Sequence, residues 1–163
     1  MRQLFVLGVL ALATAANAAV KEGENLLLNG SFEAQQASFP EFWSPSSARQ
    51  VRYSPTGGPG GESAAVVLLG DGNTPGTASA RQQGLTLVEG ESYKLTARSK
   101  TRGFKSRNAG LVLHNAGWTA ATGFTNLPAD SDWTLLEKTF TLFPSKGKEY
   151  GVAMFAIDLT GEI

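Results

Sequence analysis

The 163-residue sequence contains no cysteine, which excludes disulfides, thiolate metal sites and cysteine nucleophiles. It has a single histidine, His114, and none of the common hydrolase, metalloprotease or nucleotide-binding motifs. A glycosidase needs two carboxylates about 5–10 Å apart, and nothing marks such a pair among the fourteen acidic residues. We therefore expect that this chain has no catalytic activity of its own.

An excess of positive charge is also lacking, since the formal net charge is zero. Nucleic-acid binding normally requires a basic stripe, so we expect no nucleic-acid partner. The one dense cationic run, residues 100–107 (KTRGFKSR), is short and fits a solvated loop between strands.

Long hydrophobic runs are absent except at the N-terminus. Arg2, an apolar run over residues 4–12 and the small residues Ala16 and Ala18 form the pattern of a signal peptide, with cleavage expected after Ala18. The run is too short to span a bilayer comfortably, so we expect no membrane insertion. Export to the extracellular space, the periplasm or the cell surface is expected. Residues 19–163 then form one domain.

Helical periodicity is missing after residue 18, whereas glycine and turn signals are frequent. Short alternating or apolar runs separated by turns are typical of a β-sandwich or barrel. We expect about nine strands, near residues 26–28, 50–53, 64–69, 77–83, 85–88, 93–99, 111–114, 135–143 and 150–158. The predicted fold class is an all-β antiparallel sandwich.

The stretch 84–100 (GLTLVEGESYKLTARSK) shows the alternation most clearly. Tyr93, Leu95 and Ala97 alternate with polar residues, and a period of two indicates a strand with one buried face. The other face carries Lys94, Thr96 and Arg98 and could meet a polar ligand.

Several motifs occur in the order found in one known family. Residues 25–33 (NLLLNGSFE) resemble its "NLLxNGxFE" opening, and Trp43 stands at its "GW" tryptophan, with Phe42 in place of the glycine. Residues 60–66, 82–99, 132–140 and 150–154 resemble its later strands. The chain is thus similar, over residues 25–158, to the jelly-roll carbohydrate-binding modules of families 4, 9 and 22, which accompany bacterial glycanases.

The resemblance implies a jelly-roll sandwich of the galactose-binding-domain-like type and a carbohydrate ligand. It also implies a structural calcium near Glu33, where the family's Glu joins backbone carbonyls and a C-terminal Asp. Asp158 lies too early to fill that role. The family's final strand, with its acidic pair, has no counterpart here, so we expect a fragment that lacks its closing strand. No cofactor is expected to be required.

Sugars are recognised by aromatic stacking and by hydrogen bonds from planar polar groups. Trp118, in a loop without apolar periodicity, and Tyr53, beside a Gly-Pro loop, are the stacking candidates. Each also fits a structural role, Trp118 as a lid over one end of the core. Trp43 could contact sugar or plug the core at its rim.

Hydrogen bonds to sugar hydroxyls are expected from Arg98 and Gln83, because Gln82 or Gln83 should face outward together with Arg98. His114 could contact sugar or simply end a strand.

We expect non-catalytic binding of a polysaccharide or oligosaccharide, which would hold a covalently linked catalytic domain or a surface protein near its substrate. Two alternatives remain open. The domain could be a structural or adhesion sandwich without a sugar ligand, or a jelly-roll hydrolase or lyase.

Overall fold

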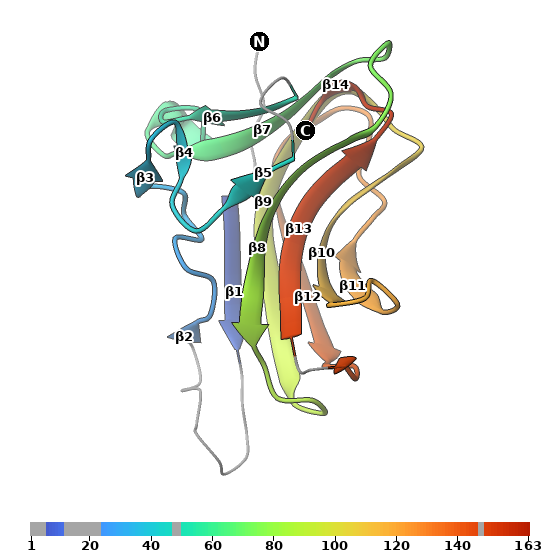
Figure 1. Ribbon diagram of the computed structural model, residues 1–163. Helices are drawn as coiled ribbons and strands as arrows, with labels where there is room; N and C mark the ends of the chain where they lie inside the picture. Colours follow the sequence, from blue (N-terminus) through green and yellow to red (C-terminus); the bar gives the residue numbers. More distant parts are fainter. Residues whose placement is uncertain (1–5, 12–23, 47–49, 147–148) are drawn as a thin grey trace.

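The computed structural model describes residues 6–11, 24–46, 50–146 and 149–163. These residues form two antiparallel sheets around a common core, with one short 3-10 helix, η1 (Pro59–Gly61) (Figure 1). The strands are β1 (Val6–Ala11), β2 (Glu24–Asn25), β3 (Gln35–Gln36), β4 (Phe39–Pro40), β5 (Ser44–Pro45), β6 (Val51–Ser54), β7 (Ala65–Asp71), β8 (Thr77–Thr86), β9 (Ser92–Lys105), β10 (Asn108–Asn115), β11 (Ala121–Phe124), β12 (Ser131–Thr141), β13 (Glu149–Ile157) and β14 (Thr160–Glu162). The predicted all-β antiparallel sandwich, jelly-roll-like in character, is confirmed.

The strand order defines two layers. The first sheet has the order β2-β1-β9-β14-β7-β6, and β12 also pairs with β9, over residues 92–101. The second sheet has the order β11-β10-β13-β8-β5, and β3 and β4 pair separately. In Figure 1, β8 and β13 of the second sheet run side by side in front of β9 and β12 of the first.

Alternation within the strands builds the core between the layers. Tyr93 and Leu95 from β9 are at most 1% exposed, as are Leu111 and Leu113 from β10 and Met154 from β13. Their neighbours along each strand point to the opposite face. The burial of these side chains is the main stabilising contribution to the sandwich.

The turn at residues 89–91 connects the two layers. The run before it ends β8 in the second sheet, and the run after it begins β9 in the first. The two runs therefore belong to different sheets and do not pair with each other.

A bulge at Gly84 joins two predicted strands, 77–83 and 85–88, into the single strand β8. Gly84 has φ of +75°, and the register against β13 shifts between Tyr150 and Val152. Glycine adopts this left-handed conformation without steric cost. Before the bulge the inward-facing positions have even numbers, as Ala80 does, and after it they have odd numbers, as Leu85 does. Gln83 lies before the switch and is on the outer face.

The predicted strand at residues 26–28 is not a strand in the structure. The backbone of Leu28 is bound by a side chain instead, because its N–H donates to Gln82 Oε1 at 2.9 Å and its carbonyl accepts from Gln82 Nε2 at 2.7 Å. The amide of the buried Gln82 thus replaces the neighbouring strand as a partner. A strand that the sequence did not indicate, β11, follows the Trp118 turn.

Strand β1 lies inside the predicted signal peptide and pairs antiparallel with β9. The expected cleavage site at Ala16–Ala18 is outside the described residues, so cleavage stays a prediction. No helix among the described residues is long and apolar enough to cross a membrane.

Candidate functional site

The outer face of the second sheet carries the candidate site. Pairing in β8, β13 and β10 sets Ala153 beside both Arg81 and Val112, and His114 beside Gly151. Directly paired residues share a face. Ala80, Met154 and Leu113 face the core. The residues that alternate with them therefore lie on the side away from the core, namely Arg81, Val112, His114, Gly151, Ala153 and Phe155.

Trp118 projects from the turn between β10 and β11 onto this face. Its indole stacks on the His114 imidazole, with ring centroids 3.6 Å apart and an angle of 14° between the planes. It also meets Phe155 edge-on, at 6.0 Å and 87°. Despite these contacts Trp118 remains 46% exposed. A large aromatic surface is therefore presented to solvent on a fixed support.

Asn115 holds the turn that presents Trp118. Its side-chain oxygen accepts hydrogen bonds from the N–H groups of Thr119 at 2.9 Å and Ala120 at 3.2 Å, while its Nδ2 donates to Thr119 Oγ1 and to the carbonyl of Pro144. The N–H of Trp118 donates to the Asn115 carbonyl at 3.0 Å. Trp118 itself has φ of +56°, a conformation that costs free energy for a non-glycine residue. The Asn115 network maintains it.

His114 is the buried support of this arrangement, with 1% exposure. Its Nδ1 lies 2.9 Å from the Asn115 carbonyl, which can only accept, so Nδ1 carries the proton. Burial lowers the pKa of His114; the hydrogen bond to Asn115 opposes this shift, and the Arg81 charge adds to it. The imidazole is therefore neutral near pH 7.

The second ring nitrogen of His114 faces Gln83. The Gln83 Nε2 lies 3.5 Å from His114 Nε2, which is the acceptor in this tautomer. Gly151 lies directly below both groups, and an added Cβ there would come within 2.8 Å of His114 Nε2 and of Gln83 Oε1. Glycine at position 151 thus makes room for the Gln83–His114 contact.

A hollow of about 300 Å³ lies beside Trp118 on the same face. Its floor is apolar, with Ala153, Phe155 and Ile157, and its walls are formed by Thr77, Ser79, Arg81, Asn108 and Trp118. An apolar floor with a few polar groups at the rim is typical of small-molecule sites. Arg81 and Asn108 are exposed and can donate hydrogen bonds to a ligand in the hollow.

Three sequence-predicted site residues, Trp118, Gln83 and His114, thus come together. His114 was predicted as a possible sugar contact. In the structure Trp118 covers it, and the imidazole supports the indole from below. Arg81, Phe155 and Asn108 were not among the site residues predicted from the sequence. The alternation of Arg81 with Ala78 and Ala80, and of Phe155 with Met154, was a usable signal for an outward face.

Arg98 does not join this site, and the prediction that it shares a face with Gln83 is wrong. It is exposed on β9, on the outer face of the first sheet. The neighbouring cations on that face are partly neutralised, since Lys94 pairs with Glu137 and Lys100 with Asp132. Alternation shows which residues share a strand face but not which sheet the strand enters.

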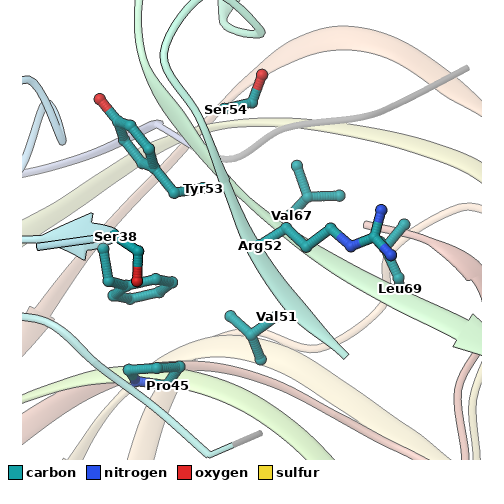
Figure 2. Close-up of a pocket in the computed structure, with 9 residues that line it drawn as sticks. Ser38, Pro45, Val51, Arg52, Tyr53, Ser54, Val67 and Leu69 are labelled. Atoms are coloured by element: carbon teal, nitrogen blue, oxygen red, sulfur yellow. The ribbon is translucent and has the colours of Figure 1, made fainter. Parts of the chain in front are cut away.

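Tyr53 lines a separate hollow of about 410 Å³ around β6, shown in Figure 2. Tyr53 and Ser38 lie on one side of the strand, and Arg52 and Leu69 lie on the other. Burial, and secondarily the nearby Glu33 carboxylate, raises the pKa of Tyr53, so its phenol is neutral. This hollow shares no lining residue with the one beside Trp118, so Tyr53 cannot stack on the same sugar ring.

Trp43 belongs to the core, so of its two predicted roles the core plug is confirmed and the sugar contact is wrong. It is 5% exposed and packs edge-on against Phe32, with ring centroids 5.0 Å apart. Its Nε1–H donates to the Asn29 carbonyl at 3.2 Å. Trp133 is also structural, since it packs on Ala65 and Val67 of β7.

Glu33, the expected calcium residue, makes a hydrogen bond within the fold. Its Oε1 accepts a hydrogen bond from the N–H of Ala64 at 2.9 Å. Within the described residues, no three His, Asp or Glu side chains gather closely enough to hold a metal ion. The expected calcium site draws on backbone carbonyls besides Glu33, so calcium binding there stays a prediction.

The chain matches no protein-family model and no curated protein sequence. The likeness to carbohydrate-binding modules consequently depends on the motifs of the sequence itself.

Proposed function

We propose that this protein binds a carbohydrate without catalysis, on the outer face of the second sheet. The observation that carries the proposal is the half-exposed Trp118 indole stacked on the buried, neutral His114. An aromatic ring held by its neighbours offers a large contact area at low entropic cost. Sugar rings present C–H faces that stack on such surfaces.

The polar rim complements the stacking surface. Arg81 and Asn108 line the hollow beside Trp118, and the exposed Gln83 contacts His114, on which the Trp118 indole stacks. These planar side chains suit the alternating donors and acceptors of sugar hydroxyls. The hollow of about 300 Å³ is at the lower end of the size range of small-ligand sites, which fits one or two sugar rings better than a long groove.

A hydrolase or lyase finds less support than a binding domain. A glycosidase needs an acid and a second carboxylate across the scissile bond, and the residues that line the Trp118 hollow include a cation but no carboxylate. In a structural or adhesion role, the partner of this face would be a protein instead of a sugar. A protein partner could also cover Trp118, and a glycan-binding test separates the two.

Export and tethering complete the proposal. The signal-peptide pattern of residues 1–18 supports secretion to the periplasm, the cell surface or the medium. A binding domain outside the cell would raise the local concentration of a linked glycanase at its substrate.

The test is affinity electrophoresis of residues 19–163 in gels that contain single soluble glycans. We expect retardation in at least one glycan, lost in Trp118→Ala and retained in Leu135→Ala. Leu135 is the matched control because it is an apolar side chain of similar exposure, 54%, on the other sheet. Lack of retardation in every glycan, or equal retardation of both variants, would refute the proposal.

A further inference from the structure

The strands of the second sheet carry almost no charge. Among the residues of β5, β8, β10, β11 and β13, all of them described, there is one cation, Arg81, and one anion, Glu149. Arg81 is paired with Ala153 of β13. Glu149 stands four residues before Ala153 on that strand, which places it about 13 Å away along the strand at about 3.3 Å per residue. The charge of Arg81 is therefore isolated on its own sheet.

Arg81 also has no counter-ion from the rest of the described chain. The ion pairs among the described residues join Lys94 to Glu137, Lys100 to Asp132 and Arg107 to Asp158. Arg81 is exposed and takes part in none of them, and its guanidinium stays charged at every physiological pH. An external anion can bind such a group without breaking an existing ion pair.

The strand register places Arg81 at one end of the hollow beside Trp118. The apolar floor is formed by the outward side chains of residues 153–157 in β13, which lies alongside β8 (Figure 1). Arg81 is paired with Ala153 at one end of this floor. Asn108 of β10 is paired with Ile157 at the other end. A cation and a neutral donor thus stand at opposite ends of one apolar surface.

The wall between these ends adds hydroxyl groups and no negative charge. Thr77 and Ser79 line the hollow from β8, and none of its lining residues is an aspartate or a glutamate. Ser79 is 7% exposed and is paired with Phe155 of the floor. A site with one unpaired cation, several neutral donors and no carboxylate is electrostatically complementary to a ligand with one negative charge.

Uronic acids combine an apolar ring face with a single negative charge. Their carboxylate is attached to the rim of the sugar ring, so one ring can stack on Trp118 and reach Arg81 at the same time. A planar carboxylate also matches the guanidinium through two parallel hydrogen bonds. Phosphorylated ligands, by contrast, are typically bound by clusters of arginines, and this hollow has one arginine.

We propose that the Trp118 hollow selects uronic acids over neutral sugars, with Arg81 as the residue that determines this specificity. Trp118 stacks on the sugar ring, Arg81 pairs with its carboxylate, and Asn108 binds a hydroxyl at the far end. This inference rests on the proposed glycan binding and names the class of sugar. The zero net charge of the chain does not oppose it, because the attraction is local and acts within a Debye length of about 10 Å.

Oligosaccharides that differ only in the carboxylate test the proposal. The full chain, expressed with export, is titrated in a calorimeter with trimers of galacturonic, glucuronic and mannuronic acid. Each is compared with its carboxyl-reduced counterpart, a neutral trimer of the same linkage. We expect at least one acidic trimer to bind about tenfold or more tightly than its counterpart, the scale of one charge-assisted pair. Raising the ionic strength from about 0.01 to 0.15 M should reduce this preference.

Variants assign the preference to one side chain. Arg81→Gln keeps a planar donor but removes the charge, and it should bind the acidic and the neutral trimer equally. Arg81→Lys keeps the charge without the fork and should retain part of the preference, which gives a second measurement if Arg81→Gln folds poorly. Arg98→Gln is the matched control, an exposed arginine on the first sheet, and should retain the whole preference. Trp118→Ala should weaken both trimers.

Two results would overturn this inference and leave the proposed glycan binding intact. One is Trp118-dependent binding of acidic and neutral trimers with equal affinity, and the other is a preference that survives in Arg81→Gln. Tighter binding of a sulfated galactan oligosaccharide than of every uronic acid would also reject the carboxylate. Absence of binding to every trimer overturns the inference, and the proposed function falls with it only if the glycan gels also show no retardation.

Discussion

The indole of Trp118 and the imidazole of His114 lie nearly parallel, with their ring centroids 3.6 Å apart. Trp118 is half-exposed and His114 is buried, so the stacked pair extends from the solvent to the surface of the sheet. The neutral state of His114 matters here, because an imidazolium at this depth would require solvation that Trp118 and Gly151 prevent.

The titration of His114 tests its buried, neutral state. We expect a pKa below the ordinary value of 6.5, caused first by burial and further by the Arg81 charge. Arg81→Ala should raise this pKa, whereas Arg98→Ala, on the other sheet, should not change it. Because the chain has one histidine, its proton NMR signal in untagged protein needs no assignment. A pKa at or above 6.5 in the wild-type protein would contradict the stacked geometry.

The same shift predicts how stability depends on pH. The folded pKa lies below the unfolded one, so the unfolded state binds the proton first as the pH falls. This contribution to the free energy of unfolding is intact above about pH 6.5 and is lost as the pH falls toward the folded pKa. His114→Phe keeps a flat ring but does not titrate, and its Tm should decrease less between pH 7 and pH 5. Parallel pH profiles for the two proteins would count against the prediction.

Gly151→Ala should disturb the contact between His114 and Gln83 beneath Trp118. The new Cβ would approach His114 Nε2 and Gln83 Oε1 to 2.8 Å, and we expect a loss of about 1–3 kcal/mol in the free energy of unfolding from overpacking. Gly117→Ala is the control in the neighbouring turn, where a Cβ meets nothing closer than 3.7 Å. Urea denaturation measures both. Equal effects of the two substitutions would show that position 151 is not constrained.

Two tryptophans should differ in their roles. Trp43→Ala removes a core ring and its hydrogen bond to Asn29, and we expect it to cost about 3–5 kcal/mol. Trp118→Ala loses mainly its contacts with His114 and Phe155, which should cost about 1 kcal/mol. Denaturation curves that rank the two variants in the opposite order would contradict their assigned positions.

Periodicity predicted much of the fold because it reports burial directly. The alternation of Tyr93, Leu95 and Ala97 predicted their buried face, and the isolated position of Trp118 predicted its exposure. Local turn chemistry was less informative. A glycine between two alternating runs marks either a turn or a bulge, so Gly84 divided one strand into two expected ones.

The grouping of the site depends on pairing between distant strands, which alternation does not encode. Arg98 and Gln83 each face outward, but β9 and β8 enter different sheets. The burial of Trp43 depends on its packing against the ring of Phe32, a contact that the alternation of residues does not reveal. Arg81 and Phe155 became site residues only through the β8–β13 register.

The most direct test of the central claim is NMR mapping of a glycan found by affinity electrophoresis. The chain has three tryptophans and therefore three indole N–H signals. We expect the Trp118 indole signal and the backbone amides of Arg81 and Gln83 to shift on titration, while the Trp43 and Trp133 indoles stay unchanged. Shifts centred on Arg98, or on the Tyr53 hollow, with Trp118 unaffected, would contradict it.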